Sequence, residues 1–133
     1  EDIDNYKLIS GYPKDVVFIK DIDLTELLMI SEIVITDLST VGLEAMLLNT
    51  PVITVNFTGK PDAMPYASSG AAIGVSDPNK LKEAVQSILN NQDTKNRLQQ
   101  NAKIFLKDYL YKLDGRSAER VNALIEEMIM ENN

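Results

Sequence analysis

Four short runs of consecutive apolar residues, many of them β-branched, divide the first part of the chain, at positions 16–19, 33–36, 52–55 and 71–75. Within each run the apolar residues follow one another instead of alternating with polar ones. That pattern is typical of strands that are buried on both faces, as in parallel sheets. We therefore expect these runs to form a parallel sheet of about four strands.

Helix signals separate the runs. Each expected helix follows a residue whose side-chain oxygen can accept hydrogen bonds from the first unpaired amides. These helices are 24–30 after Asp23, with Glu26 closing a capping box, 41–48 after Ser39 or Thr40, and one that starts at Pro78 after Asp77. The spacing predicts inward faces on the first and third helices, made of Leu24, Leu27, Leu28 and Met29, and of Leu81, Ala84, Val85, Ile88 and Leu89.

Beyond the last run the pattern is helical only. Residues 94–111 carry one apolar stripe, made of Leu98, Ala102, Phe105, Leu106 and Tyr109. A final helix capped by Ser117 is predicted to face inward with Val121, Leu124, Ile125 and Met128. Strands that alternate with helices, followed by a helical tail, predict an α/β fold with a Rossmann-like, doubly wound parallel sheet. We expect a single domain over residues 1–133, with its core at 14–90 and its helical tail at 94–131.

Composition excludes several classes of function. The net charge is −7, which argues against a broad surface for nucleic acid or anionic lipid. The chain has no cysteine and no histidine, so it supplies no disulfide, no thiol chemistry and no histidine base or metal ligand. No apolar run approaches the roughly 20 residues needed to span a bilayer.

The loops that follow the strands carry the polar groups of interest. In a parallel sheet these loops converge at the carboxyl edge, where folds of this kind bind ligands. Ser39 and Thr40 follow the second run and precede a helix with Gly42 and Glu44 in its first turns. The amides at a helix start attract phosphate, although the same residues also fit simple helix caps and a solvated glutamate. The long loop 56–69 joins them at this edge.

The chain resembles the C-terminal, donor-binding domain of GT-B glycosyltransferases, which transfer sugars from activated nucleotides. The resemblance rests on VVFIKDI at 16–22, LLMISEIVITDLSTVGLEAMLLNTPVITV at 27–55, SSGAAIGV at 68–75 and DGRSAERV at 114–121. The Thr-Asp before Ser-Thr is similar to polyol-phosphate transferases of cell-surface polymer synthesis. The segment also resembles relatives of the UDP-N-acetylglucosamine 2-epimerases, which share the fold.

The resemblance implies a role for individual residues. Glu44 matches the acid that binds the ribose hydroxyls, and Phe18 and Ile19 match the strand end that reads the base. The residues that match the diphosphate loop are Ser39, Thr40, Val41 and Gly42, and those that match the donor-sugar loop are Lys60, Asp62 and Asn56, in that order of preference. Asp37 suits a turn at the strand end, and Arg116 and Arg120 are interpreted as surface charges. The catalytic residues stay unknown, and the resemblance implies no metal and no cofactor, because the nucleotide sugar is itself a substrate.

The complete enzyme is expected to transfer a sugar or sugar-like group from a nucleotide diphosphate donor, UDP foremost, to an acceptor hydroxyl. Too few residues precede Val16 for the two further strands that the family usually has, so we expect a fragment that is inactive alone. Its partners would be the nucleotide-sugar donor and a missing N-terminal, acceptor-binding domain, with no nucleic acid. We expect a cytoplasmic protein without a membrane span, attached to a membrane, if at all, only through the missing half.

Four alternatives stay open. An epimerase of the same fold typically has Ser-Gly-Gly where this chain has Ser39-Thr40-Val41-Gly42, which favours transfer. A CDP-polyol phosphotransferase would use the same site. A receiver-type phosphoacceptor domain would use Asp37, but Asp21 and Lys60 fit its other acidic and basic positions poorly. A binding scaffold that has lost activity is disfavoured by the intact Ser39–Thr40 pair and Glu44.

Overall fold

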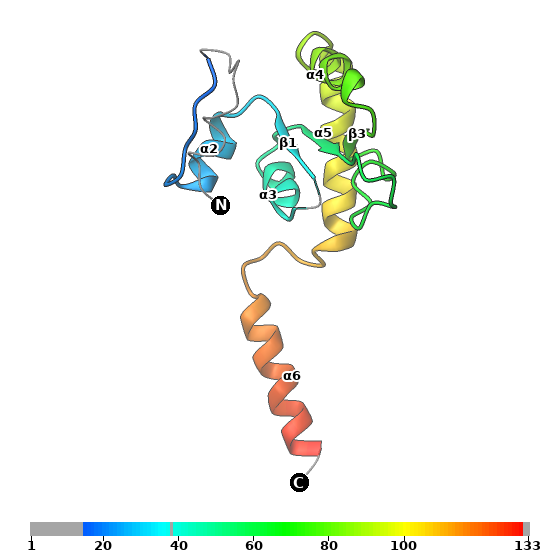
Figure 1. The fold of residues 1–133 in the computed structure, drawn as a ribbon. Coiled ribbons are helices and arrows are strands. Elements are labelled where there is room, and N and C mark those ends of the chain that lie inside the picture. The colour runs from blue at the N-terminus through cyan, green and yellow to red at the C-terminus, as the bar shows by residue number, and fades with distance from the viewer. Residues whose placement is uncertain (1–14, 38, 132–133) are drawn as a thin grey trace.

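Three parallel strands form the centre of the fold in the computed structural model, which describes residues 15–37 and 39–131 (Figure 1). Their order in the sheet is β1 (Val34–Thr36), β2 (Val52–Val55) and β3 (Ala72–Val75). Ile53 of β2 stands in register with Ile35 of β1 and Ile73 of β3. Consecutive parallel strands joined by long connections confirm the α/β class and are consistent with a Rossmann-like fold.

Helices occupy the connections and the C-terminal part of the chain. They are α2 (Leu24–Ile30), α3 (Val41–Leu47), the short 3₁₀ turn η1 (Pro78–Lys80), α4 (Leu81–Leu89), α5 (Gln92–Tyr109) and α6 (Ser117–Glu131). The predicted caps at Asp23 and Asp77 are confirmed, since their carboxylates accept from the amides of Glu26 at 3.1 Å and Asn79 at 2.9 Å. Asn91 caps α5, which therefore begins two residues earlier than the expected Thr94.

Side chains of β2 alternate between two hydrophobic clusters. Val52 belongs to a cluster with Met46, Tyr66 and Phe105, whereas Ile53 packs with a second cluster that includes Ile88. The long helix α5 contributes to both clusters and packs against α3 and α4. The central strand is therefore buried on both faces, as its continuous apolar run predicts.

The expected strand at residues 16–19 is wrong. These residues are extended but belong to no strand, and Val16, Val17 and Ile19 are exposed. A strand is stabilised by hydrogen bonds to a neighbour, and β1 pairs only with β2 among the described residues. Ile35, in the middle of β1, is also exposed. The expectation about the residues before Val16 falls on positions 1–14, which lie outside the described residues.

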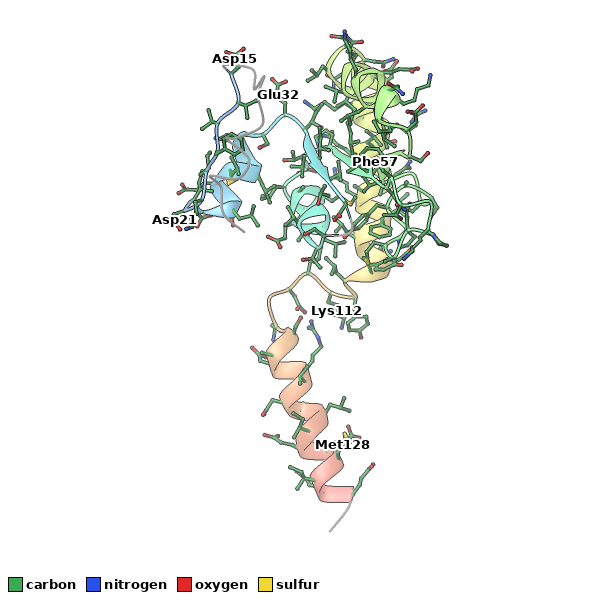
Figure 2. All side chains as sticks on the ribbon, in the orientation of Figure 1. Asp15, Asp21, Glu32, Phe57, Lys112 and Met128 are labelled. Atoms are coloured by element: carbon green, nitrogen blue, oxygen red, sulfur yellow. The ribbon has the colours of Figure 1, made fainter. Side chains whose placement is uncertain are left out.

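The predicted inward face of α6 is also wrong. Val121, Leu124, Ile125 and Met128 are all at least half exposed, and no residue of α6 is buried. Figure 1 shows α6 extending away from the sheet, and Figure 2 shows Met128 far from the α/β body. An amphipathic pattern shows that one face favours apolar contacts, but it does not specify what covers that face.

Smaller corrections concern the edges of the other apolar stripes. In α2 only Leu28 is buried, while Leu24 and Met29 are exposed, and Leu89 and Tyr109 are exposed at the ends of α4 and α5. Each of these residues lies where its helix passes the limit of the core. The helical period predicts the direction of a side chain, but the extent of the neighbouring layer decides whether it is covered.

The start of α6 is held by charged groups instead of apolar contacts. The Arg120 guanidinium bonds both carboxylate oxygens of Asp114 at 2.8 and 2.9 Å, and this hydrogen bond lowers the pKa of Asp114 below its ordinary value. The Arg120 guanidinium also lies over the ring of Tyr111, 5.7 Å from its centroid. The interpretation of Arg120 as a plain surface charge therefore changes, because it fixes the turn that leads into α6.

Candidate functional site

A cavity of about 430 Å³ lies at the carboxyl ends of β2 and β3. Thr54 and Val75 line it from the strands, and Asn56, Lys60 and Asp62 line it from the loop that follows β2. The structure thus brings together the three residues predicted for the donor-sugar loop. Because the strands are parallel, the loop after β1 leaves the sheet at the same edge.

Asn56 organises the loop that forms one wall of this cavity. Its amide nitrogen donates to the Lys60 carbonyl at 2.8 Å and to the Asp62 carboxylate at 2.6 Å. Its amide oxygen accepts from the backbone amide and the hydroxyl of Thr58, at 3.1 and 2.7 Å. The side chain of Asn56 is therefore used within the loop, whereas Lys60, which also lines the cavity, is exposed.

Replacing Asn56 with alanine removes all four of these bonds. We expect faster hydrogen exchange at the amides of Thr58 and Lys60, with a change of at most about 1 kcal/mol in the free energy of unfolding, because the bonds are exposed. Asn90→Ala is the matched control, since the exposed side chain of Asn90 makes no hydrogen bond to any described residue. Unchanged exchange in residues 58–60 of the Asn56 variant would contradict this role.

The loop after β1 forms a tight turn into α3. Ser39 supplies two acceptors to it, because its hydroxyl accepts from the Val41 amide at 3.2 Å and its carbonyl accepts from the Gly42 amide at 3.2 Å. The hydroxyl of Thr40 makes no capping hydrogen bond, so Ser39 is the capping side chain. The turn is thus held by its own groups at the position predicted for the diphosphate.

Gly42 packs closely against the Tyr66 ring. It is buried, and a Cβ added to it would lie 3.1 Å from Cε2 of Tyr66. Its missing side chain faces the Tyr66 ring, so packing against this ring is one reason for a glycine at this position. Its backbone amide already bonds the Ser39 carbonyl, as described above.

Glu44 lies in the first turn of α3 and is exposed. Its carboxylate has no hydrogen-bond or ion-pair partner within the described parts of the chain. Phe18 is half-buried and Ile19 is exposed, both on the extended segment before α2. None of these three residues lines the cavity beside β2 and β3. The cavity therefore contains the residues predicted to contact the sugar, but not those predicted to contact the ribose and the base.

Tyr66 is the residue at this edge that the sequence did not reveal. It is only 1% exposed, and burial raises the pKa of its hydroxyl above the ordinary value. The hydroxyl donates to the Ser39 carbonyl at 3.2 Å, a contact between positions far apart in the sequence. The one available signal was a tyrosine between small, polar and proline residues in an otherwise turn-rich loop, which indicates an anchor to the core.

Across residues 15–37 and 39–131, no group of three or more acidic side chains could hold a metal ion. None of the helices within these ranges is long and apolar enough to cross a membrane.

The structure is that of an α/β domain with a cavity at the carboxyl edge of its parallel sheet. Comparison with protein families matches residues 4–105 to the glycosyl transferases group 1, and the chain belongs to this family. Neither the curated proteins nor the solved structures gave a match. This match confirms the resemblance to a GT-B donor-binding domain, and domains of this family bind nucleotide-sugar donors. It gives no support to a phosphoacceptor domain that would use Asp37.

Proposed function

We propose that this chain is the nucleotide-sugar-binding half of a glycosyltransferase that transfers a sugar or sugar-like group from a UDP-linked donor to an acceptor hydroxyl and releases UDP. The observation that carries the proposal is the cavity at the carboxyl ends of β2 and β3 in a chain of this family, with Lys60 on its wall. An ammonium on the wall of this cavity can donate hydrogen bonds to the hydroxyls of a bound sugar.

The proposed donor extends along the sheet edge from β1 to β3. Its diphosphate meets the turn formed by Ser39, Thr40, Val41 and Gly42, and its sugar enters the cavity beside Lys60 and Asp62. In this arrangement Asn56 acts by holding the loop, because its amide is already bonded to Lys60 and Asp62. The Thr40 N–H would stabilise the charge that develops on a departing diphosphate, because the Val41 and Gly42 amides are already bonded to Ser39.

The nucleoside end of the donor is proposed to reach Glu44, Phe18 and Ile19. The exposed carboxylate of Glu44 accepts from the two ribose hydroxyls, which form a neighbouring pair. Phe18 and Ile19 contact the base from the extended segment before α2. A cytoplasmic location and a role in cell-surface polysaccharide synthesis remain predictions from the sequence resemblance.

Titration of the chain with UDP, CDP, GDP and ADP tests the proposal. We expect UDP to bind most tightly, with a dissociation constant in the micromolar to millimolar range, and uridine to bind more weakly because it lacks the diphosphate. Tighter binding of CDP would favour the CDP-polyol phosphotransferase over a UDP-dependent enzyme. The absence of binding by any of the four nucleotides at millimolar concentration would contradict the proposal.

A further inference from the structure

Tyr66 connects two loops that are distant in the sequence. It lies in the segment between β2 and β3, and its hydroxyl donates to the carbonyl of Ser39, in the loop between β1 and α3, at 3.2 Å. The first segment contains the proposed sugar loop, and the second contains the proposed diphosphate turn. One buried side chain therefore bridges the two parts of the proposed donor site.

The ring of Tyr66 is fixed on several sides. It lies against Gly42, and it meets the ring of Phe105 edge-on, with 5.5 Å between the centroids and an angle of 69°. The carbonyl of Tyr66 accepts from the amide of Ala72 at 3.0 Å, which ties its backbone to the start of β3. The ring that carries the hydroxyl is thus held in place by the core.

The bond to Ser39 has a geometric consequence for the diphosphate turn. A trans peptide is planar, so the Ser39 carbonyl and the Thr40 N–H point in opposite directions within one rigid unit. A carbonyl held toward the buried Tyr66 hydroxyl therefore directs the Thr40 N–H away from the ring. The same Ser39 carbonyl accepts from the Gly42 amide at 3.2 Å, so the hydroxyl also fixes the first turn of α3.

We propose that Tyr66 is a positioning residue for nucleotide-diphosphate binding, which sets the orientation of the Ser39–Thr40 peptide and couples the sugar loop to the diphosphate turn. The proposal rests on the proposed function, because it assumes that a diphosphate meets this turn. The hydroxyl of a tyrosine is protonated at neutral pH, and burial raises the pKa of Tyr66 further, so the hydroxyl remains a donor.

Tyr66→Phe removes the hydroxyl and keeps the ring, so it tests the proposal directly. Tyr109→Phe is the matched control, because Tyr109 also contacts Phe105, stacking on it at 4.3 Å, but is 48% exposed. Without ligand, we expect faster exchange of the amides of residues 40–43 in the Tyr66 variant only. With ligand, we expect Tyr66→Phe to weaken UDP binding about three- to tenfold and to leave uridine binding unchanged.

The two measurements separate the failure of this inference from the failure of the proposed function. If the unmodified chain binds UDP and Tyr66→Phe alters neither amide exchange nor UDP affinity, the inference is overturned. It is also overturned if uridine binding falls as much as UDP binding, or if Tyr109→Phe has the same effects. If the unmodified chain binds no nucleotide, the proposed function fails and the positioning role fails with it, whatever the exchange measurement shows about the turn.

Discussion

Replacing Glu44 with alanine is expected to weaken UDP binding about ten- to a hundredfold, the equivalent of about 1.5–3 kcal/mol for hydrogen bonds to a charged group. The Glu44 carboxylate has no hydrogen-bond or ion-pair partner among the described residues. It can therefore bind a ribose without first losing a hydrogen bond to the protein. Calorimetric titration with UDP measures the loss. A deoxyribose analogue of UDP should bind the unmodified chain more weakly than UDP does. The Glu44 substitution should also reduce the affinity for this analogue less than it reduces the affinity for UDP.

The chain offers a matched control for Glu44. Glu26 is an exposed acid in the first turn of α2, a helix of 7 residues like α3. Glu26→Ala changes the net charge by the same amount and should leave UDP affinity unchanged. Equal affinity in the Glu44 and Glu26 variants would remove Glu44 from the proposed site while leaving the cavity untested.

Replacing Ile53 with alanine is expected to lower the free energy of unfolding by about 2–5 kcal/mol, the range for truncating a fully buried aliphatic side chain. Ile53 is completely buried in the central strand and packs with Val75, Ile88 and Leu98. The alanine leaves a cavity between the sheet and the helices α4 and α5. The surrounding side chains are tightly packed and cannot move far enough to fill it. Denaturant unfolding at equilibrium measures the change from the transition midpoint and slope.

The control for Ile53 is the same substitution on the surface of α5. Ile104 is 63% exposed, and Ile104→Ala should change the free energy of unfolding by no more than about 0.5 kcal/mol. A loss of less than about 1 kcal/mol in the Ile53 variant would contradict the placement of this residue in the core.

Local signals account for the elements that the sequence predicted correctly. β2 and the caps at Asp23 and Asp77 depend on neighbouring residues, through a short apolar run or a side chain that bonds an amide nearby. The failed strand at 16–19 depends on a partner strand, and the failed inward face of α6 depends on a covering surface. Neither partner is encoded in the segment itself, so composition and period cannot predict it.

In the candidate site, too, the sequence predicted the contacts between chain neighbours but not those between distant residues. The sequence predicted that Asn56, Lys60 and Asp62 act in one loop, and all three line one cavity because they are neighbours in the chain. The sequence did not reveal the bond from Tyr66 to Ser39, which joins positions 27 residues apart. It also could not separate two reasons for a glycine at 42, since packing against a distant ring and approach of a phosphate both require a missing side chain.

The most direct test of the nucleotide-sugar site is to follow the backbone amide NMR signals of the chain during titration with UDP. The account predicts that the largest shift changes fall in residues 39–44 and 56–62, at the carboxyl edge of the sheet, and that α6 remains unaffected. Saturable changes confined to α6 or to the outer surface of α5, or no changes at millimolar UDP, would contradict a nucleotide-sugar site at this edge.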